Sequence, residues 1–441
     1  MGTVGLDPVP ALVPDPTGCL ATLQSSDAPI GVLAHGVFSI RWCETRSSRC
    51  LLVLGAFGTG RCGCRRLDSS TTEVRFMGTT LLIGSCEPFS GKSALVLGIA
   101  QQLNQSGHSI RFGKPLATSL DWDPDQGPLP QPLIDDDVRF VGETLGFEAE
   151  RLLPSLHLLS QATATSRLGS GQLDAGEGFD QLREQVDQHD GLTLLEGAGS
   201  LNEGLLYGLS LPQLAEGLEA KVVLVHLWQD SRSVEPLLAA KQSLGDRLVG
   251  VVLNAVTPEE VDSLERQVVP TLENLGLTVF GVMPRSPLLR SVTVGELVRR
   301  LDARVICCKD RQELLVETLS IGAMNVNSAM EFFRRRRNMA VVTGADRTDI
   351  QLAALESSTQ CLILTGAGEP LPQLISRAEE LDVPLLKVER DTLATVEVIE
   401  QAFGHVRLHE AVKATYAFRL VEEHCHLDRL FSALNLKVQN V

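Results

Sequence analysis

The sequence predicts an α/β protein with a doubly wound, mostly parallel sheet, followed by a second, smaller α/β domain. Two observations predict this architecture: short continuous apolar runs recur along the chain, and amphipathic segments such as 93–105 separate them. Continuous apolar runs are typical of strands buried on both faces, and helices between parallel strands supply right-handed crossovers. The expected strands of the first domain are 79–84, 109–115, 192–199, 221–228 and 248–256.

The boundary between the two predicted domains lies at Pro284 and Pro287, because two prolines so close together discourage regular structure. Beyond them a new alternation begins, with expected strands at 303–308, 338–344, 360–366 and 383–388. Apolar residues near helical spacing predict a C-terminal helix that packs on the body or on a partner. The predicted divisions are an N-terminal segment 1–76, a first domain 77–287, a second domain 288–407 and the helix within 408–441.

The N-terminal segment differs in composition from the rest of the chain. It holds five of the ten cysteines and seven arginines but no lysine, and the first lysine of the sequence is Lys92. We expect a disordered or non-native extension, with translation beginning at Met77. The sequence Cys62-Gly-Cys64 could be half of a metal site, but no second pair with zinc-like spacing lies nearby.

Composition and charge restrict the class of protein. Hydrophobic residues make up 44% of the chain and charged residues 21%, which is the balance of a soluble globular protein. The net charge of -16 repels nucleic-acid phosphates and anionic lipid, so we expect neither a nucleic-acid nor a membrane partner. No apolar stretch approaches the roughly 20 residues that span a bilayer, and no secretion signal is recognisable. We therefore expect a cytoplasmic protein with reduced thiols.

The segment GSCEPFSGKSA at 84–94 predicts a phosphate-binding loop. A strict loop reads G-x-x-x-x-G-K-[ST], and here Cys86 stands at the first glycine, with Gly84 two residues earlier. What remains is a buried strand, a turn of small residues and a helix that opens with Lys92 and Ser93. Free backbone N–H groups and the positive end of that helix attract phosphate oxygens. The alternative is an ordinary helix N-cap on a strand-helix turn.

This loop leads us to expect binding of ATP with Mg²⁺. Lys92 would hold the β- and γ-phosphates and act in catalysis, and Ser93 would ligate the metal. The other nucleotide contacts expected from the loop are Glu87, Ser90, Gly91 and Ala94.

Polar side chains stand at the ends of later strands, where α/β sheets bind their ligands. Lys114 could reach a phosphate or an anionic substrate there, although it could equally be a solvated lysine. Glu196 ends a buried strand, which is costly for a carboxylate without a metal, so we expect it to ligate Mg²⁺. Asp137, in the acidic triplet 135–137, is either a further ligand or part of a solvated loop. Asn254 ends another strand, where its amide could bind an adenine edge.

The order of these motifs, G-x6-GKS, GKPLATS, LLEGAGS and VGVVLNAV, resembles the dethiobiotin synthetase type of P-loop domain, which is related to the cobyrinic acid amidase and MinD group. The resemblance implies that the loop binds ATP phosphates and that Ser93 and Glu196 bind magnesium. It further implies that Lys114 lies beside the substrate and that Asn254 binds adenine.

Residues 341–355 resemble the DRTGG domain. Its signature survives as Asp346-Arg347-Thr348, while the two glycines are replaced by Asp349 and Ile350. The order of the two domains, from about 77 to 408, is similar to the N-terminal half of long bacterial phosphate acetyltransferases. Those enzymes carry acetyl transfer in a further C-terminal domain, and the few residues left here imply a regulatory half without that chemistry.

These motifs are consistent with three functional hypotheses. The first is an ATP-binding sensor or regulator, with slow ATPase activity, in which nucleotide state alters contact with the second domain or with another subunit of a homo-oligomer. The second is an enzyme of the dethiobiotin synthetase type, which uses ATP to activate the carboxylate of a small anionic metabolite through Lys92, Lys114 and magnesium. The third is a scaffold with a vestigial loop, which the replacement of glycine by Cys86 favours.

Smaller motifs predict less. The four arginines at 334–337 are either an anion-binding site or a solvated helix end. His424, Cys425 and His426 are metal-capable, but adjacent residues on a helix point in different directions, so we expect no metal there. Cys307 and Cys308 end a buried strand and are expected in the core.

Overall fold

The computed structural model describes residues 78–122, 127–323 and 325–436, together with the backbone of four short strands nearer the N-terminus. Those strands are β1 (Val32–Leu33), β2 (Gly36–Val37), β3 (Ser39–Thr45) and β4 (Ser48–Leu54). β1 pairs antiparallel with β2, and β3 with β4, in a unit of their own, Met1–Val74. Apart from these strands, residues 1–77 lie outside the described residues. The predictions of disorder in 1–76, of a start at Met77 and of half a metal site at Cys62 and Cys64 fall there and stay predictions.

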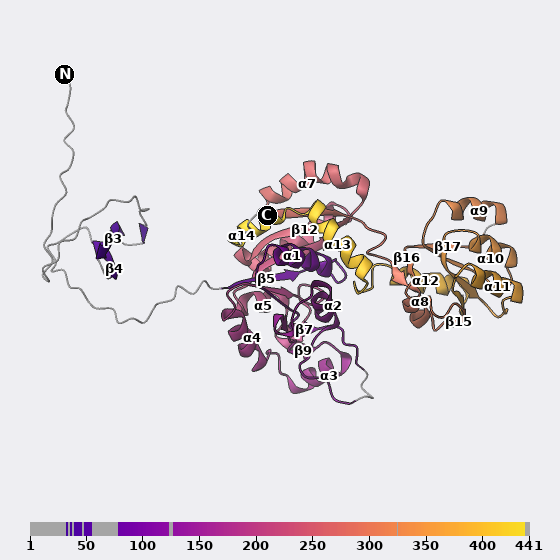
Figure 1. The fold of residues 1–441 in the computed structure, drawn as a ribbon, viewed down its shortest axis with the longest axis horizontal. Helices are drawn as coiled ribbons and strands as arrows, with labels where there is room; N and C mark the ends of the chain where they lie inside the picture. Colours follow the sequence, from indigo (N-terminus) through magenta and orange to yellow (C-terminus); the bar gives the residue numbers. More distant parts are fainter. Residues whose placement is uncertain are drawn as a thin grey trace, which may run out of the picture. The chain divides into compact units, whose positions relative to one another are not determined.

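A seven-stranded parallel sheet forms the first domain, in the order β13-β12-β11-β5-β10-β6-β8. Of its strands, β5 and β12 are labelled in Figure 1. The strands are β5 (Thr79–Gly84), β6 (Ile110–Gly113), β8 (Leu152–Leu153), β10 (Leu192–Glu196), β11 (Lys221–Leu227), β12 (Leu248–Val256) and β13 (Val279–Pro284). The predicted parallel sheet is confirmed, and β5 and β12 have the expected bounds. The first strand, β5, lies in the middle of the sheet because later strands add on both sides of it.

Helices cover both faces of this sheet, and each face has its own buried apolar cluster. The helices are α1 (Lys92–Gln105), α2 (Asp136–Leu145), α3 (Gln161–Ser170), α4 (Gly178–Asp187), α5 (Leu211–Gly217), α6 (Val234–Leu244) and α7 (Val261–Asn274). A separate parallel pair joins β7 (Leu116–Ala117) to β9 (His157–Leu158). The doubly wound architecture is therefore confirmed.

The second domain has a five-stranded mixed sheet in the order β15-β20-β19-β18-β17, in which only β15 is antiparallel. These strands are β15 (Arg304–Cys307), β17 (Thr318–Ile321), β18 (Met339–Gly344), β19 (Thr359–Thr365) and β20 (Leu385–Lys387). Around it lie the pair β14 (Val292–Thr293) and β16 (Leu315–Val316) and the helices α8 (Val294–Leu301), α9 (Val326–Arg334), α10 (Thr348–Leu355), α11 (Pro372–Glu380) and α12 (Thr392–Ala402). The smaller α/β domain is confirmed.

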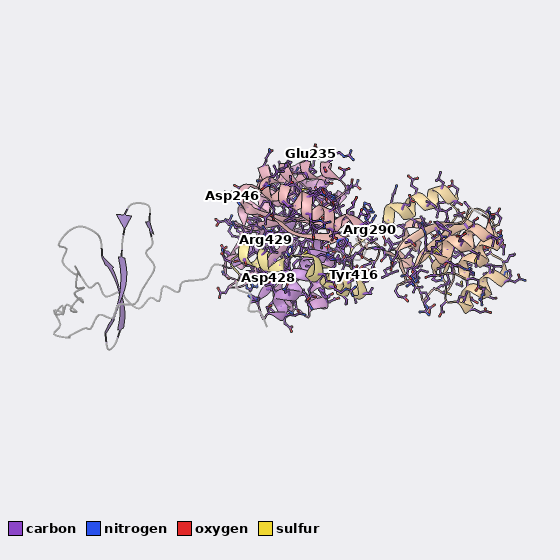
Figure 2. All side chains as sticks on the ribbon, turned by 90° about the horizontal axis from the view of Figure 1, so that it is seen from above. Glu235, Asp246, Arg290, Tyr416, Asp428 and Arg429 are labelled. Atoms are coloured by element: carbon purple, nitrogen blue, oxygen red, sulfur yellow. The ribbon has the colours of Figure 1, made fainter. Side chains whose placement is uncertain are left out.

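After the second domain the chain returns to the first. Helices α13 (Ala411–His424) and α14 (Leu427–Ala433) bury Val421 and Phe431 in the same cluster as α1. Figure 1 shows both helices, in yellow, on the first domain, with α13 beside α1. The helices α1 and α13 approach closely, since a Cβ at Gly98 would overlap the Val421 side chain. Arg429 of α14, labelled in Figure 2, donates to Glu273 of α7 at 2.6 Å. The second domain is thus inserted, in the sequence, between a strand and a helix of the first.

No helix in the described ranges is long and apolar enough to cross a membrane.

Candidate functional site

A cavity of about 540 Å³ opens where β5, β6, β10 and β12 end at their carboxyl edge. Nine residues predicted from the sequence line it: Ser90, Gly91, Lys92, Ser93, Ala94, Lys114, Asp137, Glu196 and Asn254. Parallel strands present their carboxyl ends at one edge of a sheet, which is why motifs so far apart in the sequence converge here.

The phosphate loop is held in place by its own lysine. Lys92 begins α1 and is only 7% exposed, and its Nζ donates to Ser85 Oγ at 2.9 Å and to the Gly199 carbonyl at 3.2 Å. Burial lowers the pKa of Lys92, an effect that the nearby Glu196 carboxylate opposes. An ammonium with two neutral partners in a buried site is suited to an anionic ligand, because such a ligand would supply the missing negative charge.

Gly91 gives the loop its sharp turn before α1. Its φ of 98° lies in the left-handed region, and a Cβ there would overlap Asn254 Nδ2. The Asn254 amide is fixed at this point because Nδ2 donates to the Ser90 carbonyl at 2.7 Å. Strand β12 therefore braces the loop through one hydrogen bond that leaves no room for a side chain at Gly91.

We expect Gly91→Ala to lower the free energy of unfolding by about 3 kcal/mol, because it adds left-handed strain and a clash with Asn254. Gly107→Ala is the matched control: Gly107 also has a positive φ of 74°, but a Cβ added there would have nothing within 4 Å. We therefore expect the control to lose only about 1–2 kcal/mol, from the backbone strain alone. Urea unfolding measures both variants. Equal losses would show that the contact with Asn254 carries no cost.

Ser93 and Glu196 form the part of the site suited to a metal. Ser93 Oγ donates to Glu196 Oε1 at 3.3 Å, while Glu196 Oε2 is buried and has no hydrogen-bond partner. Burial raises the pKa of Glu196, although the charge of Lys114 opposes the rise. A buried carboxylate oxygen without a partner, beside a hydroxyl, fits a hard divalent cation such as Mg²⁺, which takes oxygen ligands.

Lys114 lies among three buried carboxylates. Its Nζ is 2.5 Å from Asp137 Oδ2, 3.5 Å from Asp135 Oδ1 and 4.0 Å from Glu196 Oε1. Burial would lower the pKa of Lys114, but these carboxylates outweigh burial and raise it. Burial also raises the pKa of Asp135, against the influence of Lys114. Lys114 is therefore a buried cation that neutralises acidic groups, and it is not a solvated lysine.

Asp137 has an arginine and a histidine partner that no motif in the sequence indicated. Arg407 Nη1 donates to Asp137 Oδ2 at 2.9 Å, and His409 Nε2 lies 2.9 Å from Asp137 Oδ1. Burial would raise the pKa of Asp137, but the His409 hydrogen bond and the charges of Lys114 and Arg407 lower it well below its usual range. The acidic triplet is thus not a solvated loop, since Asp135 caps α2 through the Asp137 N–H and both side chains are buried.

Arg407 and His409 belong to residues 403–409, which we call the strap, and which join α12 of the second domain to α13. The strap also places His405 against Phe89 of the phosphate loop, with ring centroids 5.0 Å apart. The Gly404 N–H donates to the Arg290 carbonyl at 3.1 Å, and residues 403–408 line the cavity. The strap is therefore one wall of the predicted nucleotide site.

Two further arginines line the cavity, and the sequence motifs did not indicate them either. Arg285 follows β13, and Arg290, labelled in Figure 2, lies five residues later. Burial, together with the charge of Arg285, lowers the pKa of Arg290. Neither forms an ion pair with a carboxylate of the described residues. Arg285 directly follows β13, but that strand was not among the expected ones, and Arg290 lies further along the chain, so no motif indicated either arginine.

Glu87 does not line the cavity. Its Oε1 accepts from the Leu227 N–H at 2.7 Å, and its Oε2 lies 3.0 Å from His226 Nδ1. The predicted contacts of Glu87 and Asn254 with a nucleotide stay predictions.

The smaller motifs occupy ordinary positions. Arg335 pairs with Glu331 at 2.6 Å, and Arg336 lies over the Phe332 ring at 4.4 Å. Cys307 is buried and Cys308 is half-buried. Cys425 is buried, and His424, Cys425 and His426 do not gather as a metal site in the part of the chain that the structure describes.

Comparisons with known families agree with this division. An AAA domain model matches residues 79–293, and a DRTGG domain model matches residues 296–402. The chain carries an AAA domain followed by a DRTGG domain. The two matched ranges meet at the end of β14, and the AAA domain contains every predicted site residue.

The chain is homologous to phosphate acetyltransferases. It is 25% identical to that of Nitratidesulfovibrio vulgaris over 81% of this chain and 52% of the relative, and 27% identical to that of Deinococcus radiodurans over 72% and 45%. It thus spans about half the length of these relatives, which is their N-terminal half, and the predicted resemblance is confirmed. The ATP-dependent dethiobiotin synthetase BioD of Pseudomonas aeruginosa is 29% identical over 48% of this chain and 92% of its own.

Solved structures are more distant. The MinC:MinD cell division protein complex of Aquifex aeolicus covers 48% of this chain and 84% of its own at 16% identity, with a TM-score of 0.31. The CBS and DRTGG domains of a Clostridium perfringens pyrophosphatase, complexed with diadenosine tetraphosphate, cover 35% and 74% at 15% identity, with a TM-score of 0.24. The fold assignment rests on the strand order of this chain and not on these likenesses.

Proposed function

We propose that this chain is an ATP- and Mg²⁺-binding regulatory protein in which the strap couples the nucleotide site of the AAA domain to the DRTGG domain. The observation that carries the proposal is the pair of contacts from Arg407 and His409 to the buried Asp137 carboxylate. That carboxylate also binds Lys114, so one cluster of charges joins the cavity to the end of the DRTGG domain.

Different residues of the AAA domain would bind the phosphates and the metal. Lys92 and the N-terminus of α1 attract the phosphates, and Asn254 holds the loop in its bent form through the Ser90 carbonyl. Ser93 and Glu196 would hold Mg²⁺, which would neutralise phosphate charge. Slow ATP hydrolysis at this site is part of the proposal.

Lys114 is the residue through which a bound ligand would affect the strap. An anionic ligand beside Lys114 competes with Asp137 for the ammonium, because both are negative and lie on the same cation. Asp137 then depends more on Arg407 and His409, which tightens the strap over the cavity. Nucleotide binding and the ordering of the strap therefore share a coupling free energy, so that each favours the other.

Calorimetry and hydrogen exchange test this proposal on the full chain. We expect Mg²⁺-ATP to bind and to slow amide exchange in residues 403–409. Arg407→Gln is the matched variant. For it we expect an ATP affinity within about 3-fold of the parent but a smaller change in amide exchange in the strap. The reason is that the strap loses a charged hydrogen bond, which contributes about 1.5–3 kcal/mol when buried and less at this partly exposed position. Absence of ATP binding, or ATP binding with unchanged exchange in the strap, would contradict the regulatory proposal.

A second candidate is a carboxylate-activating enzyme of the dethiobiotin synthetase type. Arg285 and Arg290 favour it, because two arginines without a carboxylate partner among the described residues suit an anionic substrate beside ATP. A screen of carboxylic acids for ATP consumption separates the two: stoichiometric turnover with one acid would establish the enzyme. A vestigial loop is disfavoured by the buried, bonded Lys92. Assembly as a homo-oligomer and a cytoplasmic location stay predictions.

A further inference from the structure

Three metal-capable side chains meet at the first half of the phosphate loop, outside the cavity lining. Cys86 and Glu87 belong to the loop and His226 to β11, and their ligand atoms lie within 4.8 Å of one another. None of the three lines the cavity described above. The Glu87 carboxylate is held in place there because Oε1 accepts from the Leu227 N–H at 2.7 Å, which leaves Oε2 directed at His226.

The environment of His226 indicates that a ligand binds there. The side chain is 3% exposed, and neither ring nitrogen has a partner in hydrogen-bonding geometry, although Nδ1 lies 3.0 Å from Glu87 Oε2. Leaving a buried polar group without a partner costs about 1–3 kcal/mol. A strand as apolar as β11 would bury leucine or valine at this position at a lower cost in free energy, and a ligand on the imidazole would offset that cost.

We propose that Cys86, Glu87 and His226 bind one zinc ion. Sulfur, carboxylate oxygen and imidazole nitrogen are all zinc ligands, and three protein ligands leave the fourth tetrahedral position for water. The thiol proton passes to solvent on binding. Thiolate and carboxylate then carry two negative charges that the divalent ion neutralises, which removes the electrostatic cost of placing both groups beside a buried imidazole.

The site needs little rearrangement. Zinc bond lengths of about 2.0–2.3 Å place tetrahedral ligand atoms about 3.3–3.6 Å apart, so atoms that lie within 4.8 Å of one another must close by at most about 1.2–1.5 Å. Cys86 can make this movement because it is only partly buried and its hydrogen bond, to the Pro236 carbonyl at 3.6 Å, is weak. The ion would tie the first half of the loop to β11, at the position where a strict phosphate loop has glycine.

Zinc binding to the full-length protein tests the proposal. After removal of metal with a chelator, calorimetry with zinc alone measures the number of ions bound by the parent, Cys86→Ser, His226→Gln and the control Cys308→Ser. We expect both site variants to bind one equivalent fewer than the parent and the control to bind the parent's number. Every cysteine other than Cys86 and Cys308 is present in all four proteins, so the number of ions bound is compared with that of the parent.

Two further measurements keep the test decisive. In thermal melting, we expect zinc to raise the melting temperature of the parent and of Cys308→Ser by more than that of His226→Gln. His226→Gln alone tests the site if Cys86→Ser does not fold. Cobalt in place of zinc should give thiolate absorption that Cys86→Ser reduces. Equal stoichiometry in parent and His226→Gln would overturn the proposal and leave His226 and Glu87 as a structural contact.

Discussion

Replacing Lys92 by alanine is expected to weaken the binding of Mg²⁺-ATP by about 100-fold. A hydrogen bond to a charged group contributes about 1.5–3 kcal/mol, and the loss of about 3 kcal/mol corresponds to about two decades in Kd. The ammonium is buried and its hydrogen-bond partners, Ser85 Oγ and the Gly199 carbonyl, are both neutral, so a phosphate would supply a charged hydrogen-bond partner. Calorimetry with Mg²⁺-ATP measures the affinity of both proteins.

Lys241→Ala is the control for that experiment. The Lys241 ammonium donates to the Leu275 carbonyl at the end of α7, outside the cavity, so its removal changes the net charge equally but leaves the site intact. We expect ATP affinity within about 2-fold of the parent, which is the size of a screened long-range charge effect. Equal loss in the two variants would mean that bulk charge, and not the phosphate loop, controls binding.

Most strands of the two sheets could be predicted because they are buried on both faces, but β13 and β17 were not among the expected strands. β5, β10, β11 and β12 are continuous apolar runs, and such runs are recognisable without knowing their neighbours. The edge strand β8 has two residues and therefore no pattern. The antiparallel direction of β15 depends on its pairing with β20, which no local sequence feature specifies.

The site could be predicted only where a residue follows a strand or opens a helix. That rule placed Lys114, Glu196 and Asn254 correctly in the cavity, because the sheet brings strand ends together. It could not find Arg407 and His409, which reach Asp137 from about 270 positions further along the chain. Nor could it find His226, which stands within an apolar run and acquires its neighbours only through the sheet.

Lys114→Met should be the most destabilising substitution in the site. Lys114 is 3% exposed and lies within 4.0 Å of Asp135, Asp137 and Glu196, all buried. Removing one partner of a buried ion pair costs about 3–5 kcal/mol, since the remaining charge is uncompensated. We expect that loss in the free energy of unfolding near neutral pH, measured by urea titration. Arg139→Met is the control, because Arg139 pairs with Asp136 at the exposed surface of α2, and such pairs contribute at most about 1 kcal/mol.

The pH dependence distinguishes loss of charge compensation from loss of packing. Burial holds the pKa of Glu196 and Asp135 above their unfolded values, and without Lys114 both rise further. The folded state then binds protons more tightly than the unfolded state, so the variant should regain stability as the pH falls from about 8 towards about 5.

Asp137 acts in the opposite direction. Its pKa is lowered in the folded state, so its contribution to stability is complete above the unfolded pKa of about 4 and is lost only below it. A deficit relative to the parent that stays constant between about pH 8 and about pH 5 would mean that methionine fails to fill the space, and that the three carboxylates do not share the charge of Lys114.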